Sequence, residues 1–284
     1  MICWMFPGQP LRHTQSFPDD ADARDIVALC GRVTGFDPQA WQGGDSLASE
    51  HVRLQVYGTA MSLYRARRLL STAERPGVVA EHSMGIYAAL AACGCITEQD
   101  ALEMTARIGS CMATMSERAE YALGCVIGLE GTAVESAATN NGVYVANYNT
   151  SRHFLLSGER IPIEAAMAQC QGDGAFSVSI HGCDAPLHSP LLEEVADDLW
   201  RIFSDYRYAE PGVPLVEHIG QKRLAAARVP GFLLDDLLRP VWWERTYRVA
   251  RAMGATHFIE LGAGDALKKY NRWIESAADL TSNG

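Results

Sequence analysis

The chain has 284 residues, of which 48% are hydrophobic and 20% charged, a balance typical of a globular protein with one large core and a smaller satellite. Its formal net charge of −10 argues against binding to nucleic acid, which requires a basic surface. No stretch of sequence approaches the roughly 18 consecutive apolar residues that a membrane helix needs. We therefore expect a monomeric cytoplasmic protein without membrane or nucleic-acid contacts.

The eight cysteines lie mostly in apolar runs, and none of them forms a C-x-x-C pair. Cys93 and Cys95 are separated by a single glycine, which is not the spacing of a zinc site. We predict reduced thiols that serve packing, and no metal site.

Apolar patterning in the first part of the chain predicts alternating strands and helices. In chain order, the predicted elements are a strand over residues 1–6, a helix over 47–70, a strand over 78–80, a helix over 87–92 and a helix over 101–115. Thr97 and Asp100 have the spacing of a capping box before the last of these helices. This order indicates an α/β fold.

Residues 121–183 change to short alternating units that predict a separate small domain. The predicted elements are strands over 124–129, 143–146, 153–157 and 175–180, with helices over 132–139 and 161–170. The order β-α-β-β-α-β is that of a ferredoxin-like domain. Residues 1–120 and 184–284 form the predicted large domain, which continues with a helix over 191–203 and a strand over 257–261. A cleft between the two domains is the expected place for a substrate.

The segment V-V-A-E-H-S-M-G-I, residues 78–86, places Ser83 where a strand meets a helix. Such a turn exposes a serine oxygen and directs the next backbone N–H at a developing oxyanion. The match to G-x-S-x-G is partial, because Glu81 stands where the first glycine belongs. A chance H-S-x-G in a buried connection is the alternative.

A serine nucleophile requires a base. His188 lies in a proline-punctuated loop immediately before a predicted helix, which is a rigid place to hold an imidazole. The alternative is an ordinary surface histidine. His82 adjoins the nucleophile, but neighbours at a sharp turn generally point apart.

Two clusters of basic residues are either solvated helix faces or a docking site for an acidic partner. They are Arg65, Arg67 and Arg68, and Lys268, Lys269 and Arg272.

Several segments in order along the chain resemble the malonyl-CoA:ACP transacylase family within the polyketide synthase acyltransferase superfamily. They are residues 6–9 (F-P-G-Q), 82–85 (H-S-M-G), 147–149 (N-Y-N) with 156–158 (L-S-G), 187–191 (L-H-S-P-L), 240–243 (P-V-W-W) and 258–264 (F-I-E-L-G-A-G). The resemblance implies an α/β-hydrolase-like large domain with a parallel sheet beside the ferredoxin-like one. It also implies a ping-pong cycle, in which an acyl group passes from acyl-CoA to a serine and then to the phosphopantetheine thiol of an acyl carrier protein. No bound cofactor is implied.

Carried over by position, the resemblance makes Ser83 the nucleophile and His188 the general base. It makes Gln9 and Met84 the two residues whose backbone N–H groups form the oxyanion hole. His82 and Asn149 would line the site.

The departures from the family pattern concern the substrate. Malonyl-specific relatives place an arginine before the glycine of R-G-x-x-M, where it pairs with the malonyl carboxylate, and here that position is Ile108. Arg107 lies one residue earlier, rotated by about 100° around a helix. Burying a carboxylate beside isoleucine would cost several kcal/mol, which favours an uncharged acyl group.

Three further departures are assigned to the same pocket. Leu187 precedes the base where malonyl enzymes usually have phenylalanine, and Asp236 stands where the family often has glutamine. Glu81 is either a tolerated side chain at a strand end or a carboxylate at the mouth of the site.

The sequence therefore predicts an acyltransferase for an uncharged acyl group in polyketide or fatty-acid biosynthesis. The alternatives are an editing hydrolase that removes acyl groups from carrier proteins, a malonyl transacylase with a shifted arginine, and a catalytically idle docking subunit.

Overall fold

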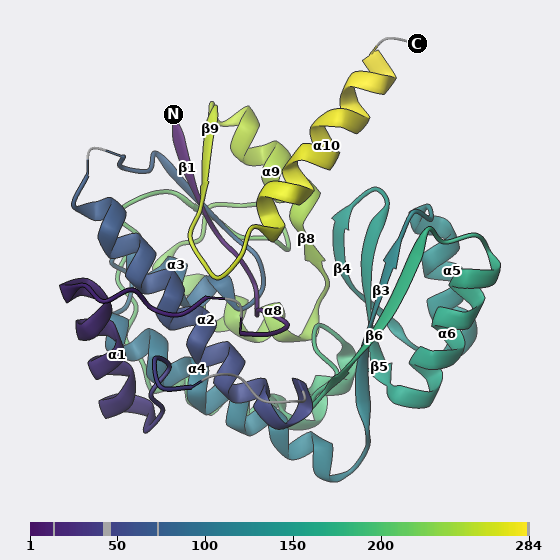
Figure 1. The fold of residues 1–284 in the computed structure, drawn as a ribbon, viewed down its shortest axis with the longest axis horizontal. Coiled ribbons are helices and arrows are strands. Elements are labelled where there is room, and N and C mark those ends of the chain that lie inside the picture. The colour runs from purple at the N-terminus through teal and green to yellow at the C-terminus, as the bar shows by residue number, and fades with distance from the viewer. Residues whose placement is uncertain (14, 42–46, 73, 283–284) are drawn as a thin grey trace.

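The structure is a computed structural model, and it describes residues 1–13, 15–41, 47–72 and 74–282. Two sheets lie side by side, each with its own helices (Figure 1). The first sheet is parallel and has the order β7-β2-β1-β9. Its strands are β1 (Ile2–Phe6), β2 (Val78–Glu81), β7 (Leu215–Val216) and β9 (His257–Glu260).

The alternation of side chains along β1 divides the large core into two layers. Trp4 and Phe6 point into a core formed with the helices on one face of the sheet, while Cys3 and Met5 point into a second core on the other face. Because both faces are covered, the strand is apolar throughout, as parallel strands generally are. The helices of the first face are α1 (Ala21–Thr34), α2 (Leu47–Leu70), α3 (Gly85–Ala92) and α4 (Glu98–Ala113), and those of the second are α9 (Trp243–Ala252) and α10 (Ala266–Ser282).

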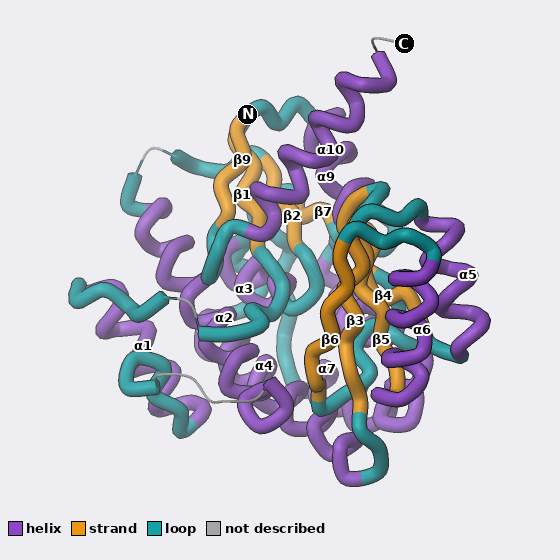
Figure 2. The backbone as a smooth tube through the Cα atoms, turned by 45° about the vertical axis from the view of Figure 1, so that its right-hand side comes forward, coloured by secondary structure: helices purple, strands orange, loops and turns teal. Residues whose placement is uncertain are grey.

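The second sheet has the order β6-β3-β5-β4-β8. Its strands are β3 (Tyr121–Ile127), β4 (Tyr144–Thr150), β5 (His153–Glu159), β6 (Ser177–Cys183) and β8 (Val241–Trp242). Helices α5 (Gly131–Asn141) and α6 (Arg160–Gly172) cover its outer face around a separate core (Figure 2). The first four strands pair antiparallel, and β8 joins β4 in parallel, which makes the sheet mixed.

The observed fold agrees with the predicted α/β class, and the insert has the predicted order β3-α5-β4-β5-α6-β6. The domain boundaries at residues 120 and 183 stay a prediction, and β8 joins the second sheet from outside the predicted small domain.

The helix predicted over 191–203 is instead a 3-10 segment (Pro190–Val195) followed by α7 (Ala196–Ser204). Apolar spacing over a single turn does not distinguish the two kinds of helix. The remaining elements are α8 (Val229–Leu238) and two short 3-10 segments, Thr114–Glu117 and Ala226–Arg228.

The predicted capping box of α4 is present, with Thr97 and Asp100 each accepting the other's backbone N–H at 3.0 Å. All eight cysteines are free thiols, six of them buried, as expected for packing residues. Within the described ranges, no helix is both long enough and apolar enough to cross a membrane.

The turn between β2 and α3 brings two backbone segments into close approach. A Cβ atom added at Gly85 would lie 2.2 Å from the carbonyl oxygen of Phe6 and 2.7 Å from that of Pro7. Neither backbone oxygen can move without displacing the end of β1. Gly85 therefore allows α3 to begin directly against the central strand.

We expect Gly85→Ala to lower the free energy of unfolding by about 1–3 kcal/mol, because the methyl group must displace main-chain atoms. Gly231→Ala is the matched control, since it lies in α8 with open space around the added methyl. It should leave stability unchanged or raise it by up to about 1 kcal/mol. Urea unfolding measures both, and equal effects of the two changes would contradict the steric argument.

Candidate active site

Ser83 and His188 form the centre of the site. The Ser83 hydroxyl lies 2.6 Å from Nε2 of His188, although the residues are 105 positions apart. Both have left-handed backbones, with φ of 55° and 54°, which is unusual for residues other than glycine. Strain of this kind is retained where the surrounding structure requires one exact orientation.

The other nitrogen of the His188 ring fixes its tautomer. Nδ1 lies 2.6 Å from the backbone carbonyl of Asp236, which can only accept, so Nδ1 carries the proton and Nε2 presents its lone pair to Ser83. Asp236 lies in the last turn of α8, and the residue four positions later is Pro240, which has no N–H to offer that carbonyl. The helix end therefore leaves the carbonyl free for the histidine, and its negative dipole favours the imidazolium that forms when His188 accepts a proton.

The surroundings keep His188 neutral. Burial, and next the charge of His218, lower the pKa of the His188 imidazole to about 3. Its base form is therefore present throughout the neutral range and is lost only below that value. A neutral imidazole hydrogen-bonded to a serine is the arrangement that general-base activation requires.

A small closed cavity of about 20 Å³ adjoins the Ser83 hydroxyl, with room for little more than one water molecule. It is lined by Gln9, Gln55, Ser83, Met84, Tyr87, Ile108, Met112, Leu187, His188 and Leu237. In the part of the chain that the structure describes, the backbone N–H groups of Gln9 and Met84 donate to no protein acceptor. Both are therefore available to an oxyanion, as the predicted roles require.

Ile108 and Arg107 lie on different faces of α4, about 100° apart. Ile108 is buried and lines the cavity. Arg107 is half-exposed and binds Asp205 at 2.5 Å and the Tyr206 hydroxyl at 3.2 Å. Its guanidinium is thus held away from Ser83, and no lysine or arginine lines the cavity among the described residues.

Four residues predicted to bind substrate do not line this cavity. Nε2–H of His82 donates to the side-chain oxygen of Asn149 on β4 at 2.9 Å, so that this pair joins the turn to the second sheet instead.

Glu81 and Asp236 are the other two, and both are fully buried rather than at the mouth of the site. The Glu81 carboxylate accepts the backbone N–H and the Nδ1–H of His218, each at 2.9 Å. Asp236 faces the opposite nitrogen, Nε2, with 3.3 Å between the atoms. Glu81 lies at the end of β2, as one expectation had it, but its carboxylate has a specific buried partner and does not stand at the mouth of the site.

Several residues of the site were not found from the sequence. Tyr87 and Met112 lie one helical turn beyond Ser83 and Ile108, a spacing that could have identified them. His51 hydrogen-bonds the side-chain amides of Gln9 and Gln55, each at 3.1 Å, and no local pattern signals this contact.

One cluster in the described chain has the donor types of a cation site, with ligand atoms of Glu81, His218 and Asp236 within 4.8 Å of one another. However, His218 already uses Nδ1 to bind Glu81, and the imidazole lies between the two carboxyl groups. Nε2 of His218 and both carboxyl oxygens of Asp236 have no hydrogen-bond partner among the described residues, and the 3.3 Å contact between Nε2 and Oδ1 is an interaction of charges. We assign no metal to the cluster.

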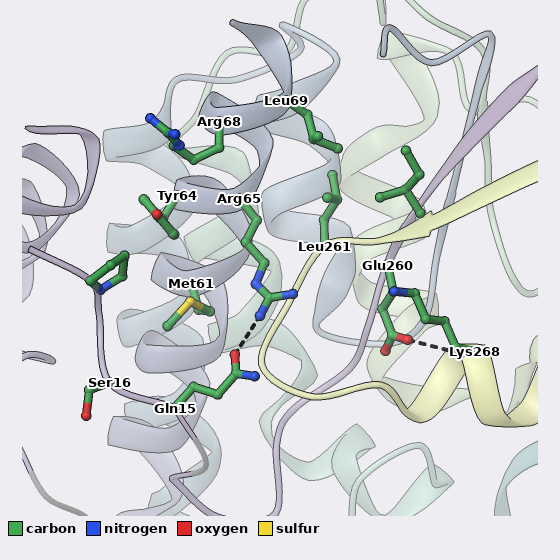
Figure 3. Close-up of a pocket in the computed structure, with 12 residues that line it drawn as sticks. Gln15, Ser16, Met61, Tyr64, Arg65, Arg68, Leu69, Glu260, Leu261 and Lys268 are labelled. Carbon is green, nitrogen blue, oxygen red and sulfur yellow. Dashed lines mark hydrogen bonds between the residues drawn. The ribbon is translucent and has the colours of Figure 1, made fainter. Parts of the chain in front are cut away.

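A larger hollow of about 740 Å³ lies between α2 and the segment from β9 to α10 (Figure 3). The two basic clusters of the sequence meet here, since Arg65 and Arg68 come from one side and Lys268 from the other. Arg67 does not line the hollow and instead binds Glu98 through two nitrogens. Arg65 contacts the side-chain oxygen of Gln15 at 2.6 Å, rather than a carboxylate.

The chain segment that lines this hollow, which we call the basic groove, packs against the segment that carries Gln9. Its wall residue Leu261 is followed by Gly262, where an added Cβ would lie 2.2 Å from the ring of Pro7. Pro7 is two residues from Gln9, which lines the cavity.

The chain is similar in sequence to proteins of known name. The malonyl CoA-acyl carrier protein transacylase of Escherichia coli O157:H7 is 27% identical over 279 residues, which cover 94% of this chain and 90% of that protein. The polyketide biosynthesis protein ThaF of Burkholderia thailandensis is 26% identical over 283 residues, which cover 96% of this chain and 24% of ThaF.

Solved structures share the fold. The malonyl CoA-acyl carrier protein transacylase of Coxiella burnetii matches with a TM-score of 0.90 at 23% identity, over 97% of this chain and 91% of that one. A malonyl-transacylase in complex with a type II PKS acyl-carrier protein matches with a TM-score of 0.89 at 24% identity, over 96% and 92%. Residues 39–263 match the family described as the acyl transferase domain. This match spans most of the chain, and the protein belongs to that family.

Proposed function

We propose that this protein transfers a small, uncharged acyl group from CoA or a carrier protein, through Ser83, to the thiol of an acyl carrier protein. The observation that carries the proposal is the neutral cavity beside Ser83, where Ile108 stands and Arg107 is tied to Asp205. The relatives named malonyl CoA-acyl carrier protein transacylase support the thioester chemistry and the carrier partner.

The geometry suits a two-step transfer. In the first step the Ser83 oxygen attacks the thioester carbonyl while its proton passes to Nε2 of His188, 2.6 Å away. The N–H groups of Gln9 and Met84 stabilise the tetrahedral oxyanion, and the thiolate leaves with the proton from His188. In the second step the carrier thiol attacks the acyl-serine by the reverse path.

The size and polarity of the cavity select the acyl group. A space of about 20 Å³ accepts a methyl-sized group without displacing Met112 or Leu187. A malonyl carboxylate in the same space would lose its water without gaining a cationic partner, at a cost of several kcal/mol.

The overall test is to incubate the protein with acetyl-, propionyl-, butyryl- and malonyl-CoA and to follow the acyl-enzyme by intact mass. Acyl-Ser83 should persist for minutes in buffer and discharge when a carrier protein with a free phosphopantetheine thiol is added. Rapid discharge in buffer that the carrier does not accelerate would favour the editing hydrolase. No acylation by any thioester would favour the idle docking subunit.

Ser83→Ala should abolish acyl loading while leaving the unfolding transition intact, because it removes one oxygen from a half-buried turn. His188→Ala should slow loading by about two to four orders of magnitude, the usual contribution of a positioned general base. Both are measured as the rate of mass gain with acetyl-CoA. Loading of the Ser83→Ala protein, or a loss below tenfold for His188→Ala, would contradict the assignments.

Ile108→Arg should raise loading from malonyl-CoA and lower loading from acetyl-CoA, because the guanidinium pairs with one substrate and stays unpaired with the other. Removing one partner of a buried charge pair typically costs about 2–5 kcal/mol, so the ratio of the two rates should change at least about tenfold. Ile108→Gln controls for side-chain length without charge.

Arg107→Ala tests the alternative of a shifted arginine. Since Arg107 binds Asp205 and Tyr206, its removal should leave the malonyl-to-acetyl ratio unchanged. A wild-type preference for malonyl-CoA that Arg107→Ala abolishes would overturn the proposed selectivity.

Carrier docking is expected at the groove of Arg65, Arg68 and Lys268. The double change Arg65→Glu with Lys268→Glu should raise the KM for the carrier at least about fivefold and leave the KM for acyl-CoA nearly unchanged, because an acidic protein surface is then repelled. Arg201→Glu, on the exposed face of α7, is the matched control. Equal effects on both KM values would contradict carrier docking and support the alternative that these residues only form a solvated helix face.

A further inference from the structure

A chain of buried polar groups lies directly behind the Ser83–His188 pair. The Glu81 carboxylate binds the ring and backbone of His218, and Nε2 of that ring lies 3.3 Å from the carboxyl group of Asp236. All three side chains are 0% exposed. Buried ionisable groups are costly unless they are paired, so their presence here requires an explanation.

Both ends of this network reach the catalytic pair. Asp236 receives the Nδ1–H of His188 on its own backbone carbonyl, and its side chain faces His218. Glu81 is the last residue of β2, two positions before Ser83. The network therefore connects the helix end that holds the base with the strand end that carries the nucleophile.

The turn that presents His218 is itself held in place. Gln221 has a left-handed backbone with φ of 54°, and its side-chain amide donates to the His218 carbonyl at 2.5 Å. The Glu217 carboxylate accepts the backbone N–H groups of Ile219 and Gly220 at 2.7 and 2.8 Å. The described residues with positive φ other than glycine are thus Ser83, His188 and Gln221, and all three lie on this network or on the pair it supports.

The charges within the network are strongly coupled. Burial is the largest single influence and lowers the pKa of His218, but the charge and hydrogen bond of Glu81, with the charges of Asp236 and Glu217, together outweigh it and raise the value to about 8. Burial raises the pKa of the Asp236 carboxyl to about 7. At neutral pH the arrangement is a Glu81–His218 ion pair beside a carboxyl group that is close to losing its proton.

The ionisable groups facing the network are few. Tyr87 from α3 has its pKa raised by burial and by the charge of Asp236, and Glu217 adds negative charge beside Glu81 and His218. His82 and His188 are both held neutral by burial, with pKa values of about 4 and 3. Loss of the proton from Asp236 therefore leaves a net negative charge next to His188, which favours the imidazolium formed during acylation.

We propose that Glu81, His218 and Asp236 form a positioning network that fixes His188 against Ser83 and supplies the negative charge that stabilises its protonated form. This proposal rests on the proposed acyl-serine chemistry. None of the three residues contacts the acyl group, and each acts through His188 or through the backbone at Ser83.

The test is the pH dependence of Ser83 reactivity. Between about pH 6 and pH 8 the rate of acylation of wild-type protein by acetyl-CoA should rise about tenfold as the network loses a proton. Asp236→Asn should lower the rate at pH 8 at least about tenfold and flatten this profile, while the KM for acetyl-CoA changes little. Glu98→Gln, which removes a partly buried carboxylate bound to Arg67, is the control and should keep the wild-type profile.

Breaking one partner of a buried charge network can prevent folding. The triple variant Glu81→Gln, His218→Gln, Asp236→Asn removes every charge together and is expected to fold, with the same flat profile as Asp236→Asn. Restoration of the pH-dependent rise by Asp236→Glu would further identify the carboxylate as its source.

A second reagent separates this proposal from the proposed function. In phenylmethylsulfonyl fluoride labelling, a bond forms between Ser83 Oγ and sulfur, the sulfur–fluorine bond breaks, fluoride leaves, and the hydroxyl proton passes to His188. This reaction needs no acyl substrate, so it reports the network even if no thioester loads Ser83. The same tenfold loss in Asp236→Asn and in the triple variant is expected.

Two results would overturn the proposal. If the acylation rate of Asp236→Asn and of the triple variant still rose with pH as in the wild type, the rise would come from titration of His188 and not from the network. Stoichiometric divalent metal in the purified protein, lost from Asp236→Asn, would make the three residues a ligand set instead of a positioning network.

Discussion

The arrangement of the site depends on one hydrogen bond, from Nδ1 of His188 to the backbone carbonyl of Asp236 at 2.6 Å. It determines which ring nitrogen faces Ser83, because a carbonyl can only accept. The carbonyl is free for this purpose because Pro240 cannot continue the helical ladder. A main-chain acceptor at a helix end thus takes the place that a carboxylate holds in a Ser-His-Asp triad.

The turn after β2 connects the two sheets. His82 reaches Asn149 on β4, while Ser83, the next residue, reaches His188. The second sheet is also tied to the large core through β8, which pairs with β4. Movement of one sheet relative to the other would therefore displace Ser83 directly, and we regard the second sheet as part of the support of the candidate site.

The proposed selectivity depends on the direction of one helix face. Moving from Arg107 to Ile108 rotates the side chain by about 100°, which exchanges the Asp205 contact for the cavity beside Ser83. The chain shares its fold and much of its length with proteins named malonyl transacylases, yet the polarity of its cavity differs from what a malonyl carboxylate requires. The proposed selectivity therefore rests on the residue at this one position, within a family whose relatives are named for acyl transfer.

Much of this protein could be predicted from the sequence. The apolar β1, the turn at Ser83, the capping box at Thr97 and the β-α-β-β-α-β insert all depend on local patterns of two to four residues, and each is found in the structure. The different directions of Arg107 and Ile108 could also be predicted locally, because they follow from the period of a helix.

Only the tertiary structure decided what Glu81 and Asp236 do. Both were assigned to the substrate pocket from their positions in motifs, but they point into the core toward His218, which is 137 residues from Glu81. The same holds for the meeting of Arg65 with Lys268 in one groove. Sequence patterns report the periodicity within an element, whereas the partner of a buried charge is set by how distant elements pack.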